Sequence, residues 1–77
     1  MKRHAVKTFE DAEGARRELA KALRTVAGFA GVGLIAEDEG RFRLKVNFQH
    51  EPPVELVPTR WRGLPVTTDV VGQSRAY

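Results

Sequence analysis

Residues 41–50, RFRLKVNFQH, constrain the fold more than any other stretch of this chain. Apolar side chains alternate strictly with polar or charged ones, which is the pattern of a β-strand with one buried and one solvated face. A slip of one residue in strand pairing would bury the arginines and expose the phenylalanines. The stretch therefore predicts a strand at 41–49 with a firmly held register, and its cationic face suggests contact with an anionic partner.

A second strand is predicted at 30–37, joined to the first by the acidic loop EDEG, residues 37–40. A short loop that ends in glycine suits a hairpin with a bulge. Placing Glu37 opposite Arg41 sets the register of the two strands. The core face then holds the pairs Ala36 with Phe42, Leu34 with Leu44 and Val32 with Val46, and the outer face holds Ile35 beside Arg43 and Gly33 beside Lys45.

The segment before the hairpin predicts an amphipathic helix at about 9–27. Thr8 is a typical N-cap, acidic residues follow it, and Gly28 is a typical helix stop. Glu13 and Arg17 are spaced for an ion pair across one helical turn. The apolar side of the helix is formed by Ala12, Ala15, Leu19, Ala22, Leu23 and Val26.

The remaining chain predicts an irregular crossing and one further strand. All four prolines fall within residues 51–65, so an irregular crossing with at most a short strand or helical turn is expected at 51–64, followed by a third strand at 65–72. One helix packed on a three-stranded, mostly antiparallel sheet is the simplest two-layer α+β arrangement for a single domain of residues 1–77. The ends, 1–7 and 73–77, are expected to be loose tails. The pattern leaves open which strand the third one joins.

The size of the chain limits how it can be stabilised. Seventy-seven residues with 42% apolar content build one small core. Natural domains of this size often rely on disulfides, metals or oligomerisation, and this chain has no cysteine. Self-association is therefore expected. No apolar run approaches the ~20 residues of a membrane span, so a cytoplasmic location and no membrane partner are expected.

Residue types that carry catalysis or bind metals are scarce. His4 lies near the N-terminus and His50 at a strand end, and neither has further ligands at metal-binding spacing. Ser74, the only serine, lies near the C-terminus. The glycines of GFAGVG, residues 28–33, follow a predicted helix, whereas a dinucleotide loop follows a strand. No enzyme activity, metal or cofactor is expected.

Two groups of residues form a candidate interaction surface. The first lies on the outer face of the hairpin, where cations stand beside a strand with small or apolar outward positions: Gly31, Gly33, Ile35, Arg41, Arg43 and Lys45. The second is the loop Arg60-Trp61-Arg62, since tryptophan and arginine dominate interface energetics. Trp61 has a second interpretation, in which it folds back onto the core. The preferred hypothesis is a non-enzymatic accessory or protein-interaction module that self-associates.

A nucleic-acid-binding module is the alternative hypothesis. The net charge of +3 is compatible with phosphate contacts through these cations. However, Phe42 and Phe48 point to the opposite face of the strand, so bases would find no aromatic platform beside the cations. A small-molecule pocket under the crossing near Trp61 is a third hypothesis.

The runs GVGLIAEDEGRFRLKVNF and GLPVTTDVVGQSRAY, joined by a Pro-rich link, resemble a small bacterial α/β domain. Its pattern is a V-G-V-G strand, an acidic turn, an alternating strand and a G-x-P-V strand ending in V-G. The pattern is associated with uncharacterised bacterial proteins and with short noncatalytic segments preceding trypsin-like peptidase domains. The resemblance covers residues 26–76, contains no peptidase motif, and implies a free-standing accessory domain without catalytic residues.

Overall fold

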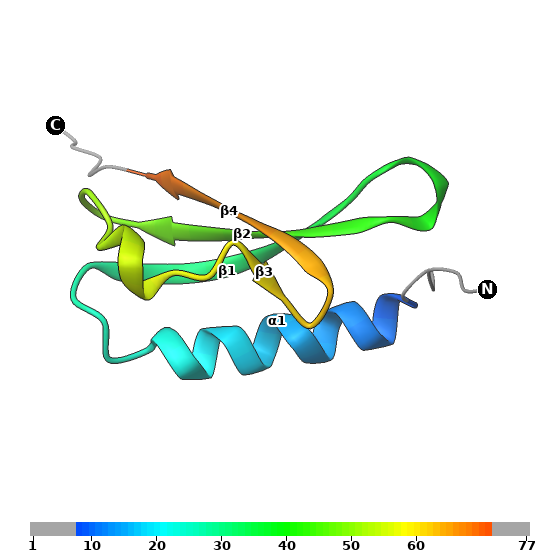
Figure 1. The fold of residues 1–77 in the computed structure, drawn as a ribbon, viewed down its shortest axis with the longest axis horizontal. Helices are drawn as coiled ribbons and strands as arrows, with labels where there is room; N and C mark the ends of the chain where they lie inside the picture. The colour runs from blue at the N-terminus through cyan, green and yellow to red at the C-terminus, as the bar shows by residue number, and fades with distance from the viewer. Residues whose placement is uncertain (1–7, 72–77) are drawn as a thin grey trace, which may run out of the picture.

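The computed structural model describes residues 8–71 and shows one helix packed on a mixed four-stranded sheet (Figure 1). The strand order across the sheet is β1-β2-β4-β3, so the predicted α+β class is confirmed. The predicted tails 1–7 and 73–77, and Gly72 at the end of the predicted third strand, lie outside the described residues. The elements are α1 (Phe9–Leu23), β1 (Phe29–Ala36), the 3-10 turn η1 (Asp38–Gly40), β2 (Phe42–Phe48), the 3-10 turn η2 (Val54–Leu56), β3 (Arg60–Trp61) and β4 (Leu64–Val70).

Helix α1 begins where the sequence predicts and ends earlier. The side chain of Thr8 accepts a hydrogen bond from the N–H of Asp11 at 3.1 Å, which is the expected N-cap contact. The helix ends at Leu23, because the N–H of Val26 donates to the Leu23 carbonyl at 2.9 Å in a tight turn. Gly28 follows with a φ of 84°. The predicted end near residue 27 is therefore wrong by about one turn.

The buried side of α1 is narrower than predicted. Ala22 is exposed and Val26 is half-buried beyond the helix end. The buried positions recur at intervals of three and four residues, which keeps them on one line along the helix. They are Ala12, Ala15, Leu19 and Leu23.

Replacing Gly14 with alanine is expected to stabilise the protein. Gly14 lies inside α1, and a Cβ added there would meet nothing within 4 Å. Alanine is favoured over glycine in a helix by roughly 0.5–1 kcal/mol, because glycine loses more backbone freedom on folding. Urea unfolding followed by circular dichroism should show this increase in the free energy of unfolding. The reverse change at the exposed Ala22, Ala22→Gly, should lower it by a similar amount, and a loss of stability in Gly14→Ala would contradict the expectation.

The β1–β2 hairpin has the predicted antiparallel register. On the face toward the helix, Val32 lies opposite Val46 and Leu34 opposite Leu44. The turn between the strands passes through two left-handed residues, Glu39 at φ 64° and Gly40 at φ 73°. Glycine is favoured at such a position, which accounts for the glycine that ends the acidic loop. A register shift between residues 29 and 31 adds a bulge at the start of β1.

The rest of the sheet differs from the prediction in two ways. Strand β4 pairs with β2 in parallel, with Leu44 opposite Val66 and Phe48 opposite Val70, so the sheet is mixed rather than mostly antiparallel. The sheet also has a fourth strand, the two-residue β3, which pairs antiparallel with the start of β4, while the crossing otherwise holds only the short turn η2, as expected. The connection from β2 to β4, residues 49–63, is long enough for the parallel pairing, because parallel neighbours need a connection of about a dozen residues or more.

The core lies between α1 and the inner faces of β1, β2 and the start of β4. Its fully buried large side chains are Leu19, Leu44, Val46 and Phe48, and the ring of Phe48 meets Phe29 edge-on at 6.1 Å between centroids. Val57 and Leu64 close the core from the crossing and from β4. Beyond Val66, every residue of β4 is exposed. The second half of β4 therefore projects past the part of the sheet that the helix covers.

Candidate functional site

The structure separates the predicted interaction residues into two groups. Gly31, Gly33, Ile35, Arg43 and Lys45 share the face of the sheet opposite the helix, because they alternate with inward-facing residues of β1 and β2, and Arg41 lies at the turn end of this hairpin. Residues 60–62 lie at the far side of the sheet, in and just after β3. Strand β4 stands between the two groups, so they do not form one continuous surface.

The cations of the outer face are neutralised by carboxylates from neighbouring strands and turns. The contacts are Arg43 to Glu37 at 2.9 Å, Lys45 to Asp69 at 3.2 Å and Arg41 to Glu39 at 3.8 Å. Arg43 also donates to the Thr67 hydroxyl at 2.9 Å, which links β2 to β4. Because three cations are matched by three carboxylates, this face offers little net positive charge to attract phosphates.

The Arg60-Trp61-Arg62 segment packs against its own domain. Trp61 is half-buried against the core, and its Nε1 is buried without a hydrogen-bond partner among the described residues. Arg62 reaches back to α1, where its Nε lies 2.6 Å from Oε1 of Glu18. Arg60 donates to the Gly63 carbonyl at 3.3 Å. Of the two interpretations of Trp61, packing against the core is the one observed.

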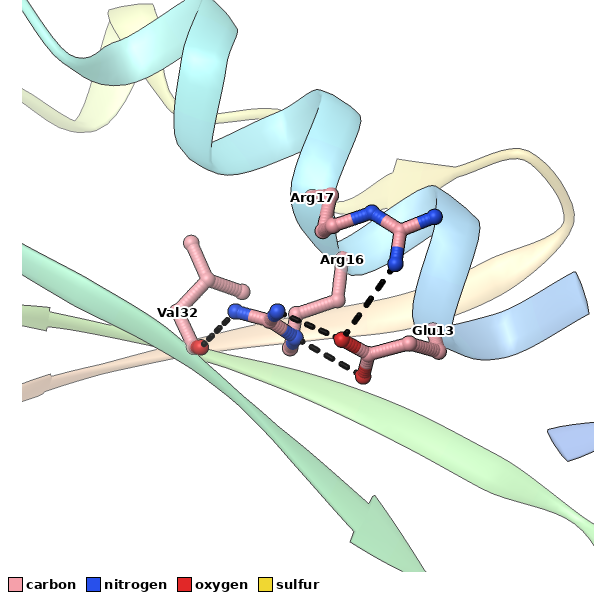
Figure 2. A network of polar contacts seen from close by, with 4 residues as sticks. All are labelled: Glu13, Arg16, Arg17 and Val32. Carbon is pink, nitrogen blue, oxygen red and sulfur yellow. Dashed lines mark hydrogen bonds and ion pairs between the residues drawn. The ribbon is translucent and has the colours of Figure 1, made fainter. Parts of the chain in front are cut away.

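The β1 edge of the sheet is shielded by α1, which runs alongside it (Figure 1). Arg16 of α1 donates from Nη1 to the Val32 carbonyl at 3.3 Å, as Figure 2 shows. Its guanidinium is held in place by Glu13, with Nε to Oε1 at 2.9 Å and Nη2 to Oε2 at 2.6 Å. A charged side chain over a strand edge hinders the addition of another strand. The predicted partner of Glu13, Arg17, makes only a 3.9 Å contact, so Arg16 is the closer partner.

The Glu13–Arg16 pair predicts a pH dependence of stability. The hydrogen bond from Arg16 lowers the pKa of Glu13, against a smaller opposing effect of desolvation. A carboxylate with a lowered pKa in the folded state stabilises the protein above its ordinary pKa, and this contribution is lost as the pH falls through the folded-state value. The stability difference between the wild type and Glu13→Gln should therefore be largest near neutral pH and shrink in acid.

Urea midpoints measured between about pH 7 and about pH 3 check this, since the range spans the usual titration of a glutamate. Glu55→Gln is the control, because Glu55 is exposed in η2. A difference between the wild type and Glu13→Gln that stays constant across this range would contradict the expectation.

The other side of the sheet has an open edge along β4. The N–H of Val66 donates to the Thr59 carbonyl at 2.9 Å, next to β3. Backbone groups alternate in direction along a strand, so the N–H and C=O of Thr68 and Val70 point to the same side as the N–H of Val66. Val71, which is out of phase with them, donates toward β2, to the Phe48 carbonyl at 2.8 Å. No strand within residues 8–71 pairs with β4 beside Thr68 and Val70.

Most of the exposed large apolar residues among residues 8–71 lie at this end of the molecule. Five large apolar residues of the described chain are exposed, and four of them lie in η2 or at the end of β4 with 48–70% of their surface accessible. Figure 1 shows η2 and the end of β4 at the same end of the molecule. The four are Val54, Leu56, Val70 and Val71, and the fifth, Phe9, lies at the start of α1. We define the open β4 edge as the backbone of residues 68–70 together with the side chains of Val70 and Val71.

A hollow of about 590 Å³ lies between the turn after α1 and the start of the crossing. It is open to solvent and lined by residues that include Val26, His50, Pro53 and Leu56. Residues 8–71 contain no group of three or more side chains placed to hold a metal ion. The hollow differs from the predicted pocket near Trp61, which does not line it.

No helix in residues 8–71 is both long and apolar enough to cross a membrane. No protein-family model, curated protein or solved structure matches the chain. The resemblance of residues 26–76 to a small bacterial domain therefore stays a prediction.

Proposed function

We propose that this protein is a non-enzymatic interaction module that binds a protein partner by strand addition to the open β4 edge. The observation that carries the proposal is the backbone of Thr68 and Val70, which no strand among residues 8–71 pairs and which lies beside the exposed side chains of Val70 and Val71. In strand addition, main-chain hydrogen bonds supply affinity and alternate side chains supply specificity. The contrast with β1, where Arg16 covers the Val32 carbonyl, supports β4 as the binding edge.

The geometry also indicates the chemistry of the partner. A strand beside β4 would meet Val70 on the helix side of the sheet and Asp69 on the outer side, since successive side chains alternate between faces. Asp69 is half exposed although it pairs with Lys45, and it disfavours an acidic residue directly opposite. The expected partner is therefore an extended segment that is apolar on one side and free of acidic residues next to Asp69.

Nucleic-acid binding has less support. The outer-face cations are paired with carboxylates, and the sheet offers them no exposed aromatic neighbours, because the phenylalanines of β2 face the helix side. The cations of this face are thus held in ion pairs rather than forming an unpaired row that could follow a phosphate backbone.

Selection of peptides from a display library tests the proposal. The Val70 N–H points away from β2, so Val70→Pro removes an edge donor without removing a bond of the β2–β4 ladder. Asp69 is already extended, as a residue before proline prefers. Peptides selected on the wild type should be extended and rich in β-branched residues, and they should bind Val70→Pro about tenfold more weakly. The control, Val70→Thr, keeps the N–H and the β-branched shape.

Binding that is equal in the wild type and in Val70→Pro would show that the peptides use another surface. The proposal is overturned when neither peptide binding nor self-association depends on the Val70 N–H. Circular dichroism of each variant establishes that the fold is retained before the affinities are compared.

A further inference from the structure

We infer that β3 is a displaceable cover over the first half of β4, and that a partner strand takes its place on binding. The inference rests on the proposed function and states what binding at that edge requires. With β3 in place, the open edge offers the backbone of residues 68–70. With β3 released, the whole of β4 (Leu64–Val70) becomes an edge.

The open edge is short for strand addition. Residues 68–70 amount to about half of an average strand, which has about five or six residues. A partner that pairs along more of β4 meets Thr59, whose carbonyl accepts the N–H of Val66 at 2.9 Å. Binding along a strand of ordinary length therefore requires that β3 leave β4.

The backbone of β4 presents an uninterrupted row of polar groups once β3 is gone. Because backbone groups alternate in direction along a strand, the N–H of Leu64 points to the same side of β4 as that of Val66. Those of Thr68 and Val70 continue the row. Pro65, which has no N–H, is out of phase with this row and faces β2. An added strand can therefore form main-chain hydrogen bonds along all of β4, and it replaces those of β3 in kind.

The contacts that hold β3 are few. Its ladder with β4 consists of the pairs Arg60 with Pro65 and Trp61 with Leu64. Trp61 is half-buried against the core, but its Nε1 is buried without a hydrogen-bond partner among residues 8–71. An unsatisfied buried donor costs free energy, which offsets part of the gain from packing the indole.

The turn that leads from β3 into β4 is strained and weakly anchored. Arg62 has a φ of 52°, a left-handed conformation that is unfavourable for a residue with a Cβ. Its ion pair with Glu18 ties the turn to α1, but the two side chains are 58% and 52% exposed, and a pair this exposed contributes little to stability. Segments held in this way open locally at a lower cost than global unfolding.

Displacement also specifies one side chain of the partner. Trp61 lies opposite Leu64, and its side chain packs against the core. A partner residue that pairs with Leu64 would occupy the place that Trp61 leaves, and a large apolar side chain there restores the lost burial. The expected partner is therefore an extended segment with a large apolar residue opposite Leu64.

A reversible cross-link between β3 and β4 tests the inference. Arg60 and Pro65 lie opposite each other next to the hydrogen bond from Val66 to Thr59, so they form a non-hydrogen-bonded pair. The Cα atoms of such a pair are about 4.5 Å apart, within disulfide range. The double variant Arg60→Cys/Pro65→Cys should therefore lock β3 when oxidised and free it when reduced. The wild type has no cysteine, so the reductant should leave its affinity unchanged.

The probe is the set of peptides that the display library yields on the wild type. They should bind the oxidised double variant about tenfold or more weakly than the reduced one, because the hydrogen bonds beside Leu64 and Val66 are denied to them. Equal binding to both forms that still depends on the Val70 N–H would overturn the inference and leave strand addition standing. Binding that does not depend on the Val70 N–H in either form would overturn the inference together with peptide addition at this edge.

Fluorescence of the wild type provides a second test if the double variant fails to fold. Trp61 is the only tryptophan, and it is half-buried while β3 lies on β4. Saturation with a selected peptide that lacks tryptophan should move the emission to longer wavelength, because the indole passes from the core into water. An emission that is unchanged at saturation would mean that β3 stays on β4, and the inference would be wrong.

Discussion

Replacing Phe48 with alanine is expected to remove most of the stability of the domain. Phe48 is fully buried at the end of β2, where its ring packs edge-on against Phe29. Truncating a buried phenylalanine to alanine costs about 3–5 kcal/mol, because the lost burial is added to the cost of the cavity. A single core in a domain of this length rarely supplies more than about 3–5 kcal/mol of stability. A large fraction of Phe48→Ala molecules should therefore be unfolded at 25 °C.

Urea unfolding monitored by circular dichroism measures this loss. Phe9→Ala is the matched control, because Phe9 is 61% exposed and touches Phe42 at the surface with 6.2 Å between ring centroids. The control should cost no more than about 1 kcal/mol. If Phe48→Ala were as stable as Phe9→Ala, the core would not be closed around Phe48.

The second large effect is expected for Gly28→Ala. Gly28 has a φ of 84°, and a Cβ added there would lie 2.5 Å from Cε1 and 2.6 Å from Nε2 of His50. The left-handed backbone alone costs an alanine roughly 1–2 kcal/mol. The imidazole must also move, since the Cβ would come closer than van der Waals contact allows. We expect both contributions to lower the free energy of unfolding.

A double-mutant cycle separates the two contributions. In a His50→Ala background the clash is absent, so Gly28→Ala should cost less than it does in the wild type. Gly31→Ala is a second control, because Gly31 has a φ of 149° but a Cβ there meets nothing within 4 Å. Equal costs of Gly28→Ala in both backgrounds would mean that the His50 ring moves aside without loss of stability.

The parts of the fold that can be predicted from sequence are those in which burial and local geometry agree. The hairpin register follows from alternation, because only one pairing buries Leu44 and Val46 while leaving Arg43 and Lys45 outside. The start of α1 follows from Thr8, because threonine is favoured as an N-cap and its side chain accepts the N–H of Asp11. The direction of β4 does not follow in the same way, because the alternation of residues 66–71 fits parallel and antiparallel neighbours equally well.

In the candidate site, too, alternation predicts some contacts, while others depend on the order of the strands. Alternation correctly places Arg43 and Lys45 on one face, but the contact between Lys45 and Asp69 depends on β4 lying beside β2, which the pattern leaves open. The open edge at Thr68 and Val70 was missed because it depends on strand order and on the short length of β3. The available signal was the pair of adjacent valines at 70 and 71, where one side chain must face away from the core.

The shielding of β1 by Arg16 bears on how far strands could be added to this sheet. A partner strand on β4 would occupy the open edge and leave β1 as the other edge, where Arg16 covers the Val32 carbonyl. A strand added at β1 would have to displace that guanidinium from both the carbonyl and Glu13. In the proposed mode of binding, the Arg16–Glu13 pair would therefore favour a complex that ends after one added strand over an open-ended fibre.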